Sequence, residues 1–321
     1  MNDKMQNAFM GLHDIGQAET LLNMQRRDNP DDSVGTEEML QKLLEAIRAA
    51  EDQGELTGDA DDFHNFSVSV SKLIQDNGVA FEIVQAGLKI HPQNTDLLAD
   101  ALLYGYNSGE RERCKEYYKK LKAIDQCNWT WRAFSFTIDY MLDSRTSSGS
   151  ENFTFGEILN VVEAYQKAKP DDENAWLSEF KVYDRTNQRE KGLEALKAAD
   201  EKFDFCPKCW LRYADVLVDR GKFEEAEPLL KKLRRNPKST ESINGAYMHL
   251  LDGQCKMAEL MNSDAYEDGE VEPKEVMKVY RAFRMALKAP DLRDSIKRQV
   301  EEYITRLSVE TDIEYPDMWW E

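Results

Sequence analysis

The stretch RGKFEEAEPLL at residues 220–230 decides how this chain is expected to fold. Gly221 suits a tight turn, because glycine adopts positive φ angles without steric cost. Ala226 and Leu230 follow four positions apart, so a small and a large apolar residue lie on the same face of a helix. The pattern predicts a helix that starts after the turn and packs closely, through Ala226, against the helix before it.

The turn and packing residues of this unit align with residues of similar size and polarity 34 positions earlier in the chain. The aligned pairs are Trp176 with Trp210, Leu177 with Leu211, Asn187 with Gly221, Gly192 with Ala226, Leu196 with Leu230, and Ala199 with Leu233. Self-similarity at a fixed period, combined with helical spacing, is typical of stacked helical hairpins.

The 34-residue period and the run at 220–230 resemble the tetratricopeptide repeat (TPR). Further runs that resemble parts of such repeats occur at 87–92, 108–121, 164–170 and 282–290. We therefore expect an all-α fold, a right-handed α-solenoid of about six TPR-like hairpins. Insertions are expected at residues 144–150 and 262–270.

The pattern divides the chain into three expected parts, which are an N-terminal helical segment (1–55), a TPR-like repeat array (61–290), and a capping helix with an aromatic C-terminal tail (291–321). In the first part, Leu40, Leu43, Leu44 and Ile47 form an i, i+3, i+4, i+7 stripe, which predicts an amphipathic helix over 36–52. In the last part, the apolar residues with helical spacing are Leu292, Ile296, Val300, Tyr303 and Leu307. A terminal repeat leaves one apolar side uncovered, so we expect this helix to cap the array.

The composition is acidic, with 61 Asp and Glu against 42 Lys and Arg in 321 residues, for a net charge of -19. An apolar fraction of 41% is sufficient for a hydrophobic core. The sequence has no uncharged apolar run of the roughly 18 residues that cross a membrane, and its start has no continuous apolar core of a signal peptide. We therefore expect a cytoplasmic protein with no membrane partner. The acidic balance argues against direct binding of nucleic acid, because phosphate contacts need clustered Lys and Arg.

Five cysteines, an odd number, favour reduced thiols over a disulfide framework. Cys206 and Cys209 form a CxxC pair, but a structural zinc site needs four ligands and the sequence has no second pair. We favour small buried residues at a repeat junction and keep a metal or redox pair as the alternative. No metal and no cofactor are expected.

Catalytic motifs are absent, including GxSxG, HExxH, glycine-rich phosphate loops and the EF-hand spacing. The carboxylates at 31–32, at 59, 61 and 62, and at 171–172 are interpreted as parts of linkers or helix starts, and at a helix start a carboxylate interacts favourably with the helix dipole. The four histidines, His13, His64, His91 and His249, have no partner at a catalytic spacing. These observations predict a protein that is not an enzyme.

The TPR resemblance implies protein binding in a concave groove lined by the first helix of each hairpin. The positions that it implies for this groove are Leu103, Tyr106, Lys181, Asp184, Asp215 and Val218. Leu177 and Leu211 stand where the TPR subgroup that clamps a C-terminal carboxylate has cations, so that specificity is not expected. The acidic groove residues instead favour a partner with a basic or mixed surface.

Aromatic residues form two further clusters. Trp129, Trp131, Phe134 and Phe136 stand at one helix start, and we expect at least half of them to pack in the core. Trp319 and Trp320 end the chain, either as a cap on the last repeat or as a motif that docks on a partner.

Together these features predict a non-enzymatic protein-binding scaffold or regulatory subunit that holds a protein or peptide. The alternatives are a peptide-sensing TPR receptor and, less favoured, an enzyme on a helical scaffold.

Overall fold

A computed structural model describes residues 12–29, 32–146, 153–236 and 238–316. The chain forms two compact units, unit 1 (Met1–Pro170) and unit 2 (Asp171–Glu321). Their boundary lies inside the expected repeat array, and the three-part division made from the sequence stays a prediction.

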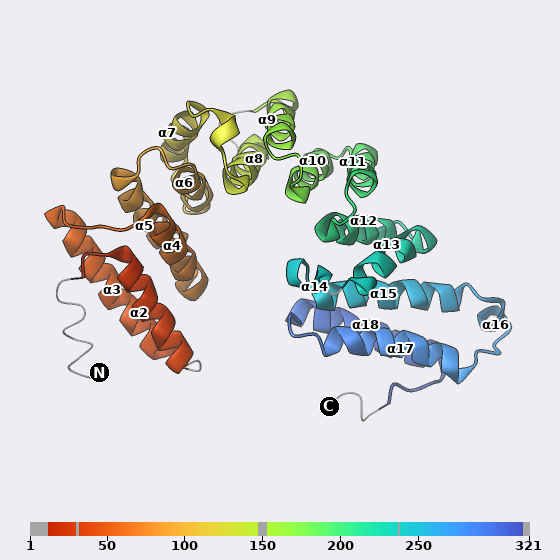
Figure 1. Cartoon of the computed structure of the whole chain (residues 1–321). Helices are drawn as coiled ribbons and strands as arrows, with labels where there is room; N and C mark the ends of the chain where they lie inside the picture. Colours follow the sequence, from red (N-terminus) through yellow and green to blue (C-terminus); the bar gives the residue numbers. More distant parts are fainter. Residues whose placement is uncertain (1–11, 30–31, 147–152, 237, 317–321) are drawn as a thin grey trace. The chain divides into compact units, whose positions relative to one another are not determined.

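Unit 1 is a stack of antiparallel helical hairpins (Figure 1). Its elements are α2 (Ile15–Asp28), α3 (Ser33–Gln53), α4 (Ala60–Ile74), α5 (Asn77–Ile90), α6 (Thr95–Asn107), α7 (Arg111–Lys122), η1 (Gln126–Asn128), α8 (Trp131–Thr146) and α9 (Phe155–Ala168). The hairpins are α4/α5, α6/α7 and α8/α9, preceded by the pair α2/α3. The first helices pack on one another, α4 against α6 and α6 against α8.

Unit 2 is also built of helical hairpins. Its elements are α10 (Glu173–Arg185), α11 (Arg189–Lys202), α12 (Pro207–Asp219), α13 (Phe223–Arg235), α14 (Ser239–Ser242), α15 (Gly245–Met261), α16 (Asp264–Glu267), α17 (Pro273–Leu287) and α18 (Asp294–Thr311). The hairpins are α10/α11, α12/α13 and α15/α17. Equivalent helices of the first two begin 34 residues apart, so the all-α, TPR-like helical-repeat fold is confirmed.

The turn and packing residues of the repeat have the expected roles. Asn187 and Gly221 end their first helices with φ angles of 60° and 71°. A Cβ atom at Gly192 would lie 3.1 Å from Phe180, and Ala226 is fully buried. Small residues at these two positions therefore let the two helices of each hairpin approach closely.

Within the described residues the secondary structure is helical, with an isolated bridge between Asp14 and Thr57 and no strand. None of the helices in these residues has both the length and the apolar run needed to cross a bilayer. Carboxylates stand at helix starts as expected. Asp59 forms a capping box with Asp62, and Asp172 accepts a hydrogen bond from the Asn174 backbone N–H at 3.0 Å.

Both flanking helices bury the expected stripes. Leu40, Leu43, Leu44 and Ile47 of α3 are buried, and so are Ile296, Val300 and Leu307 of the stripe expected in α18. Leu292 precedes α18 and Tyr303 is partly buried, while Ile304, which the expected stripe did not include, is buried. Helix α18 packs on α15 and α17, which confirms the capping helix. The start of the tail lies on α17, where the Tyr280 hydroxyl donates to the Ile313 carbonyl at 2.6 Å.

One expectation needs adjustment. Helix α8 continues to Thr146, so the first three residues of the expected insertion at 144–150 are helical. Of the four clustered aromatic residues, Trp129 and Phe134 are buried, Phe136 is partly buried and Trp131 is 47% exposed, so the expectation that at least half of them pack in the core is confirmed. Trp319 and Trp320 lie outside the described residues.

Candidate binding surfaces on the first helices

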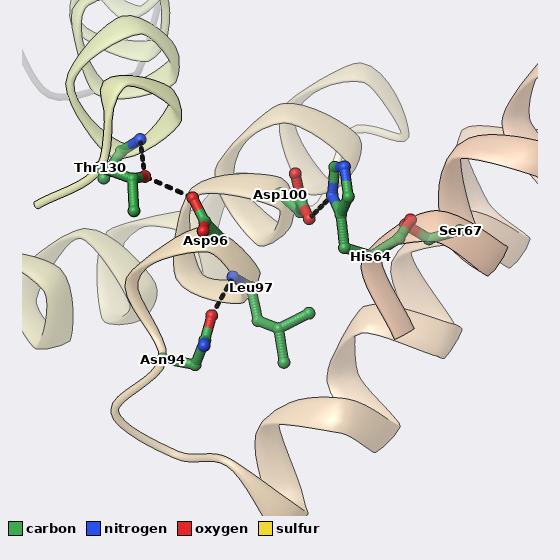
Figure 2. A network of polar contacts seen from close by, with 8 residues as sticks. His64, Ser67, Asn94, Asp96, Leu97, Asp100 and Thr130 are labelled. Carbon is green, nitrogen blue, oxygen red and sulfur yellow. Dashed lines mark hydrogen bonds and ion pairs between the residues drawn. The ribbon is translucent and has the colours of Figure 1, made fainter. Parts of the chain in front are cut away.

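Polar side chains join the first helices of unit 1 (Figure 2). The His64 Nδ1 atom on α4 lies 2.6 Å from the Asp100 Oδ2 atom on α6, and these side chains are 10% and 1% exposed. On the same α6, the Asp96 carboxylate accepts a hydrogen bond from the Thr130 hydroxyl, directly before α8. The two contacts connect three successive hairpins.

Burial dominates the electrostatics of Asp100. Desolvation raises the pKa of its carboxyl, against the opposing effect of the hydrogen bond and charge of His64. The second carboxylate oxygen, Oδ1, is buried without a hydrogen-bond partner. Burial, with a smaller effect of Asp100, also raises the pKa of Tyr104 to about 12.

The sequence analysis missed the His64–Asp100 pair because it searched for catalytic spacings. The two residues are 36 positions apart, close to one repeat length, so a search for charge partners at the repeat period would have found them. Ser67 does not turn the pair into a catalytic triad, because its hydroxyl donates to the His64 backbone carbonyl at 2.7 Å and is buried. The arrangement joins helices and offers no exposed nucleophile.

A cavity of about 260 Å³ lies on the first-helix side of unit 2. Its lining residues come from α12, α14, the segment after α14, and α15, namely Lys208, Leu211, Arg212, Asp215, Ser242, Ile243 and Tyr247. Two cations, a tyrosine and two aliphatic side chains therefore surround one cavity. Such a combination suits a ligand with both apolar and polar groups.

Asp215 organises this cavity. Its carboxylate accepts hydrogen bonds from the Arg212 guanidinium at 2.5 Å and from the Tyr247 hydroxyl of the next first helix. Burial and the hydrogen bond to Asp215 raise the pKa of Tyr247, so its phenol keeps its proton. Asp215 is only 5% exposed, so it shapes the cavity mainly by positioning Arg212 and Tyr247.

The predicted groove residues are placed unequally. Leu103 and Tyr106 on α6, and Lys181 and Asp184 on α10, are partly exposed. Val218 is 8% exposed and packs in the hydrophobic core of unit 2. Of the six predicted positions, Asp215 is the one that lines the cavity in unit 2.

Cys206 and Cys209 are buried, unpaired thiols at the junction of α11 and α12. Their Sγ atoms contact backbone carbonyls, at 3.8 Å for Ala199 and 3.5 Å for Glu173. The hydrogen bond with Cys206, together with burial, raises the pKa of Cys209, which disfavours the thiolate that metal binding and nucleophilic attack require. No group of three His, Cys, Asp or Glu gathers as a metal site in the part of the chain that the structure describes.

No protein-family model and no curated protein matches this chain. Among solved structures, a TPR protein from Parabacteroides merdae shares 15% identity at a TM-score of 0.49, covering 89% of this chain and 98% of that one. The human IFIT1 dimer with m7Gppp-AAAA shares 14% identity at a TM-score of 0.44, covering 94% of this chain and 66% of that one. A monomeric IFIT1 mutant with Gppp-AAAA shares 16% identity at a TM-score of 0.42, covering 91% and 68%.

The exclusion of nucleic acid as a direct partner was wrong. IFIT1, which has a similar helical arrangement, is solved with m7Gppp-AAAA, although this chain's acidic balance had been taken to exclude such ligands. The physical error lies in using the net charge of the whole chain, because phosphate binding depends on local clusters of Lys and Arg. Helix α7 carries such a cluster, since six of its 12 residues are Lys or Arg.

Proposed function

We propose that this chain is a non-enzymatic scaffold that binds a partner protein or peptide along the first helices of its hairpins. The observation that carries the proposal is the cavity between α12 and α15 in unit 2. Leu211 and Ile243 supply aliphatic surface for a partner side chain, while Lys208 and Arg212 supply donors for its carbonyl or carboxylate groups.

The remaining first-helix residues extend the proposed surface within each unit. Leu103 and Tyr106 belong to unit 1, where the Tyr106 ring packs edge-on against Tyr140 at 6.1 Å. Lys181 and Asp184 belong to unit 2, one hairpin before the cavity. Asp215 contributes indirectly, by holding Arg212 and Tyr247 in place.

Two further features support the proposal. Among the described residues, no nucleophile contacts the imidazole of the buried His64–Asp100 pair, which favours a role in packing over one in catalysis. All five cysteines are unpaired, which favours a reducing compartment, and we propose a cytoplasmic location.

The test uses the full chain as bait in extracts of its native host, with bound proteins quantified by mass spectrometry. The variant Leu211→Ser with Ile243→Ser removes the aliphatic walls, and we expect it to lose the partners that the unchanged chain retains. Val309→Ser removes an apolar side chain that is 79% exposed on α18 and serves as the matched control. Thermal melts followed by circular dichroism establish that both variants are folded.

An identical set of bound proteins on the unchanged chain and the double variant would overturn the proposal. Treating the extract with nuclease distinguishes a direct protein partner from nucleic acid. Proteins that remain bound after treatment support a direct protein partner, whereas complete loss of binding assigns the surface to nucleic acid.

A further inference from the structure

Helix α7 is strongly basic in an acidic chain. Its sequence, RERCKEYYKKLK at 111–122, holds six Lys or Arg and two Glu, while the whole chain has a net charge of -19. Lys119, Lys120 and Lys122 lie in the last turn, where cations stabilise the helix dipole. Arg111 and Arg113 lie in the first turn, where cations are unfavourable, so helix stability does not account for them.

A groove of about 500 Å³ in unit 1 lies between α3, α5 and α7. Its charged and polar lining consists of Arg48 and Glu51 from α3, Glu82, Gln85 and Lys89 from α5, and Arg113, Glu116, Tyr117 and Lys120 from α7. Since α5 and α7 are second helices of their hairpins, this groove is separate from the first-helix surface.

The two sides of the groove differ in charge balance. Between α3 and α5, Arg48 pairs with Glu82 at 2.6 Å and Lys89 with Glu51 at 2.5 Å. On α7, Arg113 is 56% exposed, with Glu110 at 3.7 Å and Gln85 at 3.5 Å as its neighbours. Arg113 therefore shares its charge with Glu110 in a long, exposed ion pair, whereas no carboxylate of the described residues lies within ion-pair distance of Lys120.

On the same α7 side, the Lys120 ammonium is exposed and lies 5.3 Å from the centre of the Tyr117 ring. An ammonium over an aromatic face keeps its full positive charge and remains available to an anion. Lys120 and Arg113 therefore form the cationic edge of the groove.

Aliphatic side chains line the groove as well. Leu44 and Ile47 come from α3, and Ile83 and Ala86 come from α5. An occupant that matches the groove therefore needs apolar groups beside carboxylates.

We propose that the groove between α3, α5 and α7 docks an acidic amphipathic segment of a partner protein. Its carboxylates lie against Arg113 and Lys120, and its apolar side chains lie toward Leu44, Ile47 and Ile83. An amphipathic helix keeps these two kinds of side chain on separate faces, so its apolar face can enter the groove while the carboxylates at the border of that face lie beside the cations of α7.

The groove favours such a peptide over a nucleic acid. Glu51, Glu82 and Glu116 line it, so a phosphate backbone, charged at every residue, fits less well than a segment whose carboxylates alternate with apolar side chains. Base stacking needs an open aromatic face, whereas Lys120 covers one face of Tyr117 and the ring meets Phe81 at 88°.

Binding is measured by fluorescence anisotropy with the full chain. The probe is a labelled helical peptide of about five turns with Leu on one face and Glu on the other, and the reference peptide has Gln in place of Glu. We expect the Glu peptide to bind at least about tenfold more tightly than the Gln peptide, and its affinity to fall as salt is added.

The double variant Arg113→Gln with Lys120→Gln should weaken binding of the Glu peptide by about tenfold or more. Its matched control is Lys197→Gln with Lys297→Gln, which removes two cations whose side chains are 65% and 55% exposed in unit 2. The control should leave the affinity unchanged. All four replacements are exposed and compatible with a helix, and circular dichroism melts establish folding.

Three results would overturn the proposal. The first is equal affinity of the α7 double variant and its control for the Glu peptide. The second is equal affinity of the unchanged chain for the Glu and Gln peptides. The third is binding of single-stranded oligouridylate that is tighter than binding of the Glu peptide and is abolished in the α7 double variant. A photo-cross-linker on the Glu peptide gives an independent readout. Cross-links to α3, α5 or α7 support the site, and cross-links confined to unit 2 contradict it. This site and the first-helix surface use different helices, so the failure of one does not decide the other.

Discussion

Trp176 and Trp210 occupy equivalent positions in consecutive repeats but are covered differently. Trp210 is 5% exposed, and its indole N–H donates to Asp200 at 2.6 Å. Trp176 is only partly buried and lies between Phe203 and the Lys202 ammonium, which is 4.1 Å from the centre of the indole ring. Recurrence at the repeat period identifies a packing position, but the depth of burial differs between the two repeats.

Replacing Trp210 with Ala should lower the free energy of unfolding by about 3–5 kcal/mol, the usual cost of removing a buried large aromatic residue. Trp176→Ala should cost clearly less, because its ring already contacts solvent. Urea unfolding followed by circular dichroism measures both. The exposed Trp131 provides the control, and a cost for Trp176→Ala equal to that of Trp210→Ala would contradict the difference in burial.

The buried carboxyl of Asp100 predicts a specific pH dependence. Burial raises its pKa in the folded chain, so between its ordinary pKa and the raised value the folded state holds a proton that the unfolded state has lost. The free energy of unfolding that Asp100 contributes is therefore full below the ordinary pKa and is lost as the pH rises through the raised one. Each unit by which the folded pKa exceeds the unfolded pKa contributes about 1.4 kcal/mol.

Asp100→Asn removes this titration. We compare the midpoint of thermal unfolding of the variant with that of the unchanged chain at each pH. The variant's midpoint minus that of the unchanged chain should increase as the pH is raised from about 4 to about 7. Asp204→Asn, at an exposed site between α11 and α12, controls for the loss of one negative charge. A difference between Asp100→Asn and the unchanged chain that stays constant across this range would show that Asp100 does not titrate abnormally.

At the scale of the elements, the turns between helices carry the most local part of the fold. Gly221 has a φ of 71°, and its added Cβ would meet no atom closer than 3.9 Å, so the cost of a side chain there is conformational. Gly221→Ala should destabilise the chain by about 1–2 kcal/mol, because L-residues disfavour this region.

Gly156, in helix α9, also has open space around its Cβ position. Gly156→Ala should instead stabilise by up to about 1 kcal/mol, and chemical denaturation that gives both changes the same sign would contradict this assignment.

The sequence predicts these elements well because their signals are local. The turn at Gly221, the small residue at Ala226 and the stripe from Leu40 to Ile47 each depend on residues within about two helical turns of one another. The contacts of the candidate sites are of another kind. Asp215 meets Tyr247 from 32 residues away, and that contact exists only after two hairpins have stacked.

Side-chain direction on a first helix was also beyond the sequence. Consecutive helical residues point about 100° apart, so an alignment that is off by one residue exchanges surface for core. Val218 and Asp215, three positions apart, are both buried, at 8% and 5% exposed, and of the two it is Asp215 that lines the cavity.

At the scale of the whole molecule, the distribution of charge is more informative than its sum. A net charge of -19 implies repulsion spread over the chain, while α7 is locally basic. A total taken over 321 residues conceals a cluster within 12 of them, which is why composition gave a wrong exclusion of nucleic acid.

This difference between total and local charge leads to opposite responses to salt. Raising NaCl from about 20 mM to about 200 mM shortens the Debye length to below about 10 Å, so the long-range repulsion is screened and the midpoint of thermal unfolding at pH 7 should rise. Exposed ion pairs such as Lys197–Glu201 oppose the trend little, because each contributes at most about 1 kcal/mol. Binding of the Glu peptide to the α7 groove should weaken over the same range, since it depends on attraction. Near pH 4.8, the isoelectric point, the repulsion vanishes and the stabilisation by salt should vanish with it. A midpoint at pH 7 that falls as salt is added would mean that local ion pairs, and not the total charge, govern the stability of this chain.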